Sequence, residues 1–538
     1  MIVAGGPQRR GKAYIVGAGP GDPGLLTERA VRVLAIADLV LYDALVHRAV
    51  LARARPGATL EHVGARHAWG RDRATDGTTT ERADAGNDAR QTRIHDRMIG
   101  AARAGQVVVR LKGGDPFLFG RGSEEAEALA AAGVDFEVVP GVPSPTAVAA
   151  YAGISLTHRD LAASVVLLTG TERADRPSSA HDWGKLASAA QTVCIFMGMH
   201  RLEEVVASLV SHGRDPETPI AIVANGTRPD QYVIEGTLTS IVERARARFR
   251  EGSPALLVVG EVVRLRERIR WFDNRPLFGK RTLVTRAREQ SGALSELLRD
   301  EGAEPIEIAT IRLVPPLDRA RLEKAAREAA AYDLVVFTSQ NGVRAFFEAV
   351  ERTDGDTRRL GRATVAAIGP ATARALRDRG IRADVVPEEY VAESLVASLR
   401  TLGPFAGKSV LLPRAAVARD VVPDALRAEG ATVDVVEAYR TVGPEEADVA
   451  ELRARLDARE IDVVTFTASS TCRNLVEALG ADAAGLLAHC FVASIGPVTT
   501  ETARTLGIRV DATATTFTLE GLVQSLRAGL ARRESAKG

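Results

Sequence analysis

Residues 110–122 read Arg-Leu-Lys-Gly-Gly-Asp-Pro-Phe-Leu-Phe-Gly-Arg-Gly, and they decide how the first half of the chain is interpreted. The apolar run from Gln106 to Leu111 predicts a short strand that leads into this stretch. The glycine pair at 113–114 lets backbone approach a ligand closely, Asp115 can accept hydrogen bonds from ligand hydroxyls, and the two phenylalanines offer flat apolar surface. The pattern predicts a ligand-binding loop, with a tight turn over two core phenylalanines as the alternative.

Length, charge and cysteine content narrow the class of protein. With 538 residues the chain exceeds a single hydrophobic core, so we expect two or more domains. Its 70 basic and 69 acidic residues give a net charge of +1, which argues against a broad basic surface for nucleic acid. The three cysteines lack CxxC spacing, so neither a disulfide framework nor a metal site is predicted. No apolar run is long enough for a signal peptide or a membrane span, so we expect a cytoplasmic protein without a membrane partner.

The N-terminal segment alternates strand and helix patterns. A short apolar strand at 12–16 runs into the turn Gly17-Ala-Gly-Pro-Gly-Asp22, and a helical pattern over about 25–36 precedes a second strand at 38–42. Strand, glycine turn, helix and strand in this order predict an α/β domain with a parallel sheet. A second α/β unit begins at the apolar run 164–170, so we expect this half to fold as two lobes with the ligands between them.

The same turn leaves a dinucleotide site open as an alternative. In that interpretation the chain is an NAD-dependent oxidoreductase, and Asp43 binds a ribose. Two residues argue against it: Asp22 stands where the dinucleotide fingerprint has its third glycine, and Pro20 stiffens the turn that must wrap a pyrophosphate.

The first half resembles the uroporphyrinogen-III C-methyltransferases. The resemblance is carried by the 110–122 stretch, by the turn at 17–22 and by Tyr-Ala-Gly-Ile-Ser-Leu-Thr-His-Arg at 151–159, and it extends over 11–273. It implies S-adenosylmethionine as methyl donor, uroporphyrinogen III as substrate and precorrin-2, formed by two methylations, as product. It also implies a homodimer.

The resemblance further implies site residues. Asp43 matches the family's proton acceptor, which removes the proton that leaves once a pyrrole carbon has been methylated, and Arg110 completes the catalytic pair. From the residues alone, Asp43 is equally well a helix cap. Arg121 and Arg159 supply positive charge for the substrate carboxylates. The cofactor positions are Pro20, Gly113, Gly114, Asp115, Leu118, Pro143, Ser144, Met197 and Gly226.

The sequence departs from the family at one position. Ala65 stands where the family has a lysine, its proposed proton donor, and we assign no residue to that role. The following segment, 66–93, is polar and is predicted to be a surface loop, either a lid near the substrate or an inert insertion. This departure leaves an alternative in which only the second half is active and the first is a degenerate tetrapyrrole-binding or regulatory domain.

After a short linker at 274–279, the second half contains an internal repeat. Its copies alternate apolar strands with amphipathic helices, which predicts two similar α/β lobes with a ligand cleft between them. The matching segments are 333–339 with 462–468, 367–373 with 494–500, and 392–399 with 519–526.

The whole of 280–530 resembles uroporphyrinogen-III synthase, which cyclises hydroxymethylbilane to uroporphyrinogen III with loss of water and inversion of one ring. The resemblance implies that one lobe combines about 280–311 with about 442–530, and that the other holds about 312–441. Tyr439 matches the candidate acid that helps the hydroxyl leave. The candidate substrate-binding residues are Thr338, Ser339, Ser469 and Thr499, although hydroxyl residues after strands are also common helix caps.

We therefore expect a two-lobed methylase-type α/β half followed by a two-lobed synthase-like α/β half, together forming a bifunctional enzyme of tetrapyrrole biosynthesis. A non-catalytic tetrapyrrole sensor is the remaining alternative. Whether precorrin-2 goes on to cobalamin or to sirohaem stays open at this point.

Overall fold

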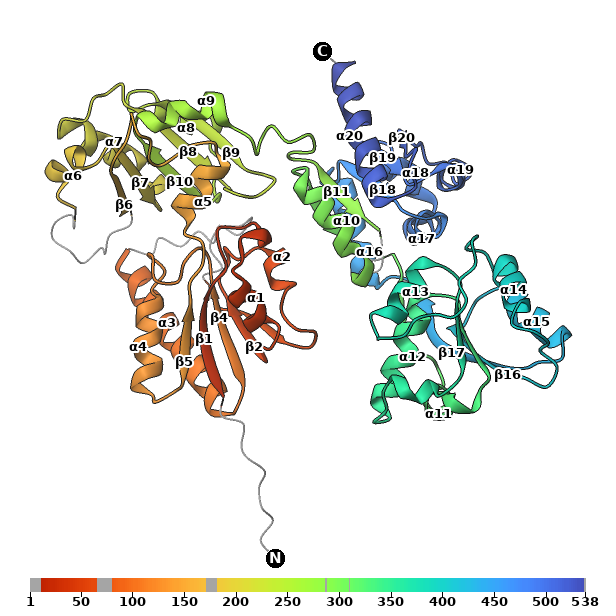
Figure 1. Cartoon of the computed structure of the whole chain (residues 1–538). Coiled ribbons are helices and arrows are strands. Elements are labelled where there is room, and N and C mark those ends of the chain that lie inside the picture. Colours follow the sequence, from red (N-terminus) through yellow and green to blue (C-terminus); the bar gives the residue numbers. More distant parts are fainter. Residues whose placement is uncertain (1–10, 65–79, 171–180, 286–287, 309, 537–538) are drawn as a thin grey trace, which may run out of the picture. The chain divides into compact units, whose positions relative to one another are not determined.

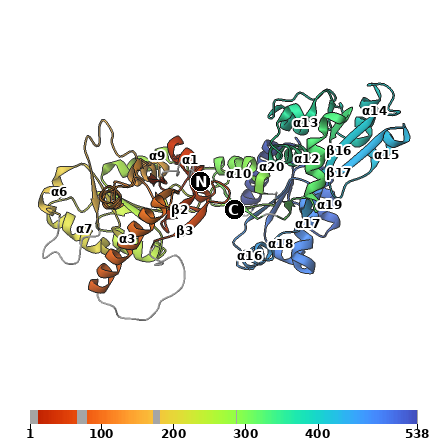
Figure 2. The ribbon, with the colours of Figure 1, turned by 90° about the horizontal axis from the view of Figure 1, so that it is seen from below.

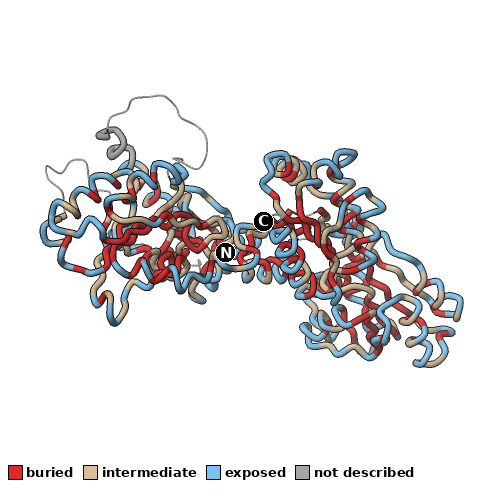
Figure 3. Tube along the Cα trace, turned by 90° about the horizontal axis from the view of Figure 1, so that it is seen from above, coloured by how far each residue is buried: buried red, intermediate tan, exposed pale blue. Residues whose placement is uncertain are grey.

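The computed structural model describes residues 11–64, 80–170, 181–285, 288–308 and 310–536 (Figure 1). The chain divides into two compact units. The first comprises Met1–Lys280 with Leu298–Glu304, and the second comprises Arg281–Leu297 with Pro305–Gly538. Each unit contains two five-stranded sheets, and the buried residues follow these sheets (Figure 3). The α/β class predicted for both halves is confirmed.

The first sheet is wholly parallel, as predicted. Its strands, in spatial order, are β3 (Thr59–His62), β2 (Leu39–Tyr42), β4 (Val107–Lys112), β1 (Lys12–Gly17) and β5 (Phe136–Val139). Successive side chains of a strand point to opposite faces of the sheet, so β1 and β4 each contribute side chains to two separate hydrophobic cores. Val16 and Val109 are buried in one of them, and Ile15 and Val108 in the other.

The helices of this sheet correct one prediction. They are α1 (Glu28–Leu34), α2 (Arg48–Leu51), α3 (Thr80–Arg103), α4 (Gly122–Ala131) and α5 (Ser144–Tyr151). A loop over 66–93 was predicted, but the part from Thr80 onward belongs to α3. Ile94, Met98 and Ala101 recur at helical spacing and are buried in the core that contains Ile15, and this anchors the helix. Ala65 and residues 66–79 lie outside the described residues.

The second sheet is mixed rather than parallel. Its strands, in spatial order, are β6 (Val165–Thr169), β7 (Thr192–Phe196), β10 (Ala255–Val259), β8 (Pro219–Ala224) and β9 (Tyr232–Thr237). β6 and β7 are parallel, whereas β10 runs antiparallel to both of its neighbours. The associated helices are α6 (Trp183–Ala189), α7 (Leu202–Ser211), α8 (Ile241–Arg248) and α9 (Arg266–Ile269).

Two sheets also form the second unit, and the chain passes between them twice. The strands of one sheet are β12 (Glu304–Glu307), β11 (Arg281–Val284), β18 (Val463–Phe466), β19 (Phe491–Ser494) and β20 (Ala512–Thr513). Those of the other are β13 (Arg312–Val314), β17 (Thr432–Val442), β16 (Ser409–Ala415), β14 (Leu334–Phe337) and β15 (Thr364–Ala367). The first sheet thus takes its strands from both ends of the unit, and the second takes them from the middle.

Helices pack on both of these sheets, and α14 and α15 lie side by side (Figures 1 and 2). The helices of this unit are α10 (Arg288–Asp300), α11 (Arg319–Arg327), α12 (Gln340–Arg352), α13 (Pro370–Arg377), α14 (Ala392–Arg400), α15 (Val421–Ala428), α16 (Glu446–Asp457), α17 (Ser469–Leu479), α18 (Ala483–Leu487), α19 (Pro497–Thr505) and α20 (Leu519–Ser535).

The internal repeat is confirmed down to single hydrogen bonds. The backbone N–H of Val365, in β15, donates to Asp384 at 2.8 Å, and that of Val492, in β19, donates to Asp511 at 2.9 Å. Each aspartate lies nineteen residues after the strand residue that it binds, so the equivalent strands β15 and β19 are fixed by the same hydrogen bond in the two copies.

Two features of the described residues concern location and reactivity. No described helix is long and apolar enough to cross a membrane. All three cysteines are free thiols and buried, and this burial raises the pKa of Cys194 and Cys490 to about 12 and that of Cys472 to about 11.

Candidate active sites

Three loops meet backbone to backbone at the carboxyl edge of the first sheet. Gly19 and Gly114 exchange hydrogen bonds, with N–O distances of 3.2 and 2.8 Å. A Cβ on Gly141 would lie 2.3 Å from the carbonyl oxygen of Gly114, so only glycine permits this approach. The contact brings together the loops that carry seven of the predicted cofactor residues. These are Pro20, Gly113, Gly114, Asp115, Leu118, Pro143 and Ser144.

Asp115 fastens two of these loops. Its Oδ1 accepts a hydrogen bond from the backbone N–H of Phe117 at 2.9 Å, and its Oδ2 accepts one from that of Gly141 at 3.1 Å. The sequence suggested Asp115 as an acceptor for ligand hydroxyls. In the structure both oxygens already serve backbone donors, so the residue shapes the loop, and only its remaining lone pairs face other donors.

The loop after β8 joins this edge from the second lobe of the first unit. Gly226 stands between Asn225 and Thr227, which have φ angles of 50° and 66°. A Cβ on Gly226 would lie 2.5 Å from Cγ1 of Val148 in α5, so the loop packs directly on that helix. Thr227 Oγ1 accepts from the backbone N–H of Asp22 at 3.1 Å, which ties the loop to the turn after β1.

Apolar side chains line the same region. Phe119 and Phe196 lie edge to face, with ring centroids 5.0 Å apart. Met197 follows Phe196 with a φ of 50° and stays 48% exposed, and Leu118 is half-buried. Met197 is therefore not a core methionine. Strained backbone held beside an open apolar surface is typical of ligand sites.

A charged cluster lies under this edge, and we call Asp43, Arg110, Lys112, Glu125 and Gln91 the Arg110 cluster. Arg110 donates to Asp43 Oδ1 at 2.6 Å and to Glu125 Oε1 at 2.9 Å. Lys112 and Gln91 also donate to Glu125 Oε1, at 3.1 and 3.2 Å. Arg110 is thus held between two carboxylates, of which Glu125 is fully buried and Asp43 is 28% exposed.

Burial governs the electrostatics of the cluster. The pKa of Lys112 is lowered, chiefly by desolvation and then by the nearby Arg110. Burial also works against the charge of Arg110, but its two carboxylate partners outweigh it and raise the pKa of the guanidinium. Glu125 Oε2 is buried without a hydrogen-bond partner among the described residues. Sequence reasoning missed Glu125, because an acidic residue in a polar helical run looks exposed.

The two predicted substrate arginines of this unit lie apart from the cluster. Arg121 directly precedes α4 with a φ of 57°, and its side chain pairs with Glu124 at 2.7 Å and with Asp88 at 3.3 Å. Arg159 is exposed on a turn closed by mutual hydrogen bonds between His158 and Ala162. Among the described hydrogen bonds and ion pairs, none joins either arginine to Asp43 or Arg110.

A cavity of about 650 Å³ lies between the end of β3 and α3. It reaches Gly64, where an added Cβ would lie 3.5 Å from the Cα of Asp43. One wall is formed by α3, where Arg97 pairs with Glu61 at 2.9 Å; sequence reasoning missed this wall because it assigned its first part, up to residue 93, to a loop. The lining residues are Glu61, His62, Val63, Gly64, Arg90, Arg93, Ile94, Asp96 and Arg97.

In the second unit, Tyr439 meets one of the predicted hydroxyl turns. Its phenol lies 3.1 Å from Ser339 Oγ, which also accepts from the backbone N–H of Gly342 and caps α12. The pairing of β16 with β17 shifts register between Arg414 and Ala415, opposite Tyr439, and such bulges re-aim side chains. Thr338, directly after β14, is half-buried beside Ser339.

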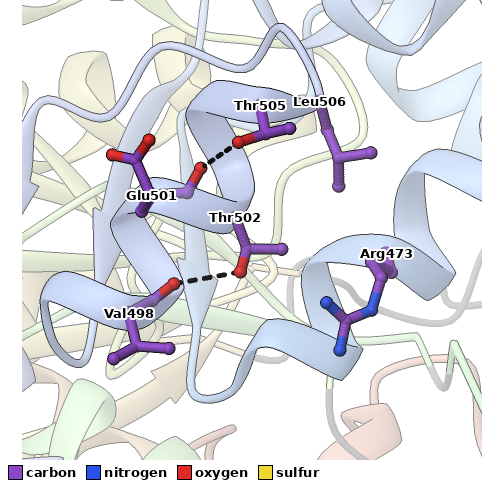
Figure 4. A pocket seen from close by; sticks show the side chains of 6 residues that line it. All are labelled: Arg473, Val498, Glu501, Thr502, Thr505 and Leu506. Atoms are coloured by element: carbon purple, nitrogen blue, oxygen red, sulfur yellow. Dashed lines mark hydrogen bonds between the residues drawn. The ribbon is translucent and has the colours of Figure 1, made fainter.

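The other predicted hydroxyls lie at the starts of α17 and α19. Ser469 Oγ accepts from Thr502 Oγ1 at 2.8 Å and donates to the carbonyl oxygen of Val498 at 3.4 Å, and Thr499 is buried. The contact joins the two helices at a groove of about 450 Å³ (Figure 4). The residues that line it are Arg473, Val498, Glu501, Thr502, Thr505 and Leu506.

Nothing in the described part of the chain resembles a metal centre, since no three His, Cys, Asp or Glu side chains there are grouped to hold an ion.

Comparison with known proteins assigns each unit to a family model. Residues 12–242 match the model of the tetrapyrrole (corrin/porphyrin) methylases, and residues 292–524 match that of uroporphyrinogen-III synthase HemD. The porphyrin biosynthesis protein HemD of Ruminiclostridium josui is 33% identical over 523 residues, which cover 96% of this chain and 97% of that protein.

Two further matches each cover about half of this chain. Siroheme synthase 1 of Klebsiella pneumoniae is 45% identical over 269 residues, which cover 50% of this chain and 52% of that protein. The chain thus spans about half the length of that relative. A crystal structure of uroporphyrin-III C-methyl transferase from Thermus thermophilus, complexed with S-adenyl homocysteine, is 37% identical and covers 47% of this chain and 99% of that one, with a TM-score of 0.38.

The match to the Ruminiclostridium protein runs through both units, and each unit matches its own family model. The chain therefore belongs to the family of porphyrin-biosynthesis proteins that join a tetrapyrrole methylase to a uroporphyrinogen-III synthase, and it is a two-domain enzyme of tetrapyrrole biosynthesis.

Proposed function

We propose that the second unit cyclises hydroxymethylbilane to uroporphyrinogen III, and that the first unit methylates this product twice to give precorrin-2. The observation that carries the proposal is the union, in one chain, of the Arg110 cluster at a glycine-lined edge with Tyr439 at a hydroxyl turn. The two activities are consecutive, because the product of the second unit is the substrate of the first.

The loops of the first unit fit S-adenosylmethionine. Gly113, Gly114 and Gly226 let the loops pack closely around the site, Leu118 and Met197 offer apolar contacts, and Asp115 retains acceptor lone pairs for a ribose. Pro20, Pro143 and Ser144 complete the set. When bound, S-adenosylmethionine supplies an electrophilic methyl group to a pyrrole carbon.

Asp43 is the base of the methylation in this proposal. Methylation of a pyrrole carbon leaves positive charge on the ring, and a proton must leave the ring nitrogen or the adjacent methylene bridge to restore neutrality. Asp43 Oδ2 accepts this proton while Oδ1 stays bonded to Arg110. Arg110 holds the carboxylate in place, and Glu125 holds Arg110 from the other side. The basic wall formed by Arg90, Arg93 and Arg97 of α3 attracts the carboxylates of uroporphyrinogen III to this position. Arg121 and Arg159 contribute further positive charge.

In the second unit, Tyr439 acts as the acid of the cyclisation. Its hydroxyl donates a proton to the departing hydroxyl group of hydroxymethylbilane, and water leaves. Ser339 positions the phenol through the 3.1 Å hydrogen bond. Thr338, Ser469 and Thr499 stand after strands that end at the carboxyl edges of their sheets, where hydroxyl and backbone donors bind substrate carboxylates.

We expect Gly226→Ala to weaken cofactor binding. The new Cβ meets Val148, and overpacking of this kind costs about 1–3 kcal/mol, or roughly tenfold or more in affinity if the loop moves to relieve it. Calorimetric titration with S-adenosylhomocysteine measures the change. Gly100→Ala is the matched control, because a Cβ there meets nothing within 4 Å. Equal affinities in the two variants would contradict the assignment of Gly226.

Tyr439→Phe is expected to slow the cyclisation about tenfold. This loss is smaller than the ~10²-fold minimum usual for removal of a general acid, because the substrate also loses its hydroxyl spontaneously. The fraction of the spontaneous type I isomer should rise in parallel. The rate and isomer ratio are measured with hydroxymethylbilane, and methylation of supplied uroporphyrinogen III serves as the internal control. A variant with wild-type rate and isomer ratio would remove Tyr439 from the reaction.

The proposal as a whole is tested by an anaerobic assay of the purified chain with hydroxymethylbilane, with and without S-adenosylmethionine. We expect uroporphyrinogen III without the cofactor and a dimethylated product with it. Uroporphyrinogen III in both reactions would restrict activity to the second unit and make the first a tetrapyrrole-binding domain. The type I isomer alone would refute the synthase assignment.

We further propose domain limits of 11–273 and 280–530, with the synthase lobes formed by 280–311 plus 442–530 and by 312–441. The enzyme is proposed to be a cytoplasmic homodimer, associated through the methyltransferase unit, that acts on free tetrapyrroles without nucleic acid or membrane partners. The names of its first-unit relatives favour sirohaem as the destination of precorrin-2.

A further inference from the structure

Each repeat of the second unit exposes one aromatic ring at the same place. Tyr390 is 61% exposed and Phe517 is 66% exposed. They lie 127 residues apart, which is also the separation of Gly369 and Gly496, the glycines of the two Ile-Gly-Pro turns. A single exposed ring is ordinary on a protein surface, but the same ring position in both copies of a repeat calls for an explanation.

Both rings rest on these glycines. A Cβ on Gly369 would lie 3.2 Å from Cγ of Tyr390, and a Cβ on Gly496 would lie 3.0 Å from Cδ1 of Phe517. The φ angles of the glycines, −177° and 176°, are extended values that any residue adopts. The glycines are therefore needed for space and not for backbone freedom. They let each aromatic side chain lie close to the turn while more than half of its surface stays open to solvent.

The rings stand next to the predicted substrate hydroxyls. Gly369 follows β15, and Ser339 follows the neighbouring parallel strand β14. Gly496 follows β19, and Ser469 follows its neighbour β18. Since parallel strands end at one edge of a sheet, each ring is one strand away from a hydroxyl turn. Val498, which lines the groove of Figure 4 and is 76% exposed, extends the apolar surface from Gly496.

We propose that Tyr390 and Phe517 are stacking platforms for pyrrole rings of the linear tetrapyrrole, one in each repeat of the second unit. A pyrrole is a flat π-system whose carboxylate substituents reach polar groups at its rim, and each platform offers a ring face beside hydroxyl donors. The methylene bridges of a linear tetrapyrrole rotate freely, so fixing two of its rings lowers the entropic cost of closing the macrocycle. This inference rests on the proposed synthase activity and adds specific substrate contacts to it.

The test uses the full chain with hydroxymethylbilane under anaerobic conditions and no S-adenosylmethionine. Tyr390→Ala and Phe517→Ala are each expected to raise KM by roughly 3–10-fold, the size of one lost aromatic contact. The double variant should raise it by about the product of the two, because the sites are separate. Tyr390→Phe and Phe517→Tyr retain a ring and should restore KM, which also excludes proton donation by Tyr390.

Two further variants separate stacking from folding. Gly496→Ala leaves Phe517 in the chain but displaces its ring, and it should raise KM as Phe517→Ala does. Leu402→Ala removes a partly exposed apolar side chain beyond the C-terminal end of α14, whereas Tyr390 lies before the N-terminal end of that helix, and it should leave KM unchanged. Methylation of supplied uroporphyrinogen III checks the first unit in every variant.

The outcomes are distinct. Alanine variants with wild-type KM and isomer ratio would overturn the platforms and leave the synthase activity intact. Alanine variants that lose activity with a fall in thermal stability, and are not rescued by the second ring type, would assign the rings a structural role and likewise overturn the proposal. A wild-type chain that yields only the type I isomer would refute the proposed function, and this inference with it.

Discussion

Replacing Glu125 with alanine should destabilise the first unit by about 3–5 kcal/mol, the usual cost of removing one partner from a buried ion pair. Glu125 is fully buried and accepts hydrogen bonds from Arg110 and Lys112, which are themselves 3% and 4% exposed. Without it, two buried cations face each other, and only Arg110 keeps a carboxylate partner, Asp43. Few single substitutions in this unit should cost more.

Tryptophan fluorescence during urea unfolding measures this change, because Trp69, Trp183 and Trp271 all belong to the first unit. Glu124→Ala is the matched control. Glu124 is the neighbouring acid, but its pair with Arg121 is exposed, and such pairs contribute about 0–1 kcal/mol. If both variants unfold at the same urea concentration, Glu125 does not balance the buried charge.

Asp43→Asn is expected to lower the methylation rate by about 10²–10⁴-fold, the range lost when a general base is removed. The amide keeps the shape of the side chain, but it accepts a proton poorly and carries no negative charge to balance that of Arg110. Binding of S-adenosylhomocysteine should be nearly unchanged, because the predicted cofactor residues lie on other loops. Calorimetry and single-turnover methylation of supplied uroporphyrinogen III separate these two effects.

The second unit provides the internal control for this variant. Asp43→Asn fed with hydroxymethylbilane should make uroporphyrinogen III at the normal rate and accumulate it. Methylation at more than a third of the wild-type rate would show that another group takes the proton. Glu61 and Asp96 would then be tested next, since they are the carboxylates that line the cavity and a carboxylate can accept a proton, whereas the arginines of α3 cannot.

The sequence was informative wherever glycine and strand patterns determine structure locally. The turn at 17–22 and the glycine pair at 113–114 were predicted as separate loops, and the structure joins both, together with Gly141, at one sheet edge. A parallel sheet places strand ends together, so the meeting of these loops follows from the topology. The repeat of the second unit could also be recognised from the sequence, because its two copies retain similar residues at matching positions.

What the sequence left out depends on tertiary contacts. Glu125 reads as a surface residue until Arg110, Lys112 and Gln91 close around it. Helix α3 begins in a polar stretch, and only the later apolar positions, Ile94 and Met98, secure it to the sheet. The signal was their helical spacing, which a loop does not require. The mixed direction of the second sheet also has no local signature, because strand direction is set by the connections between strands.

The three buried thiols determine how this chain can be labelled. Their raised pKa values leave almost no thiolate near neutral pH, and their side chains are at most 1% exposed. Alkylating reagents should therefore not react with the native cysteines of the folded protein. One cysteine introduced on the surface of each unit would then carry a fluorophore pair without prior removal of native cysteines, and energy transfer could follow the separation of the two units.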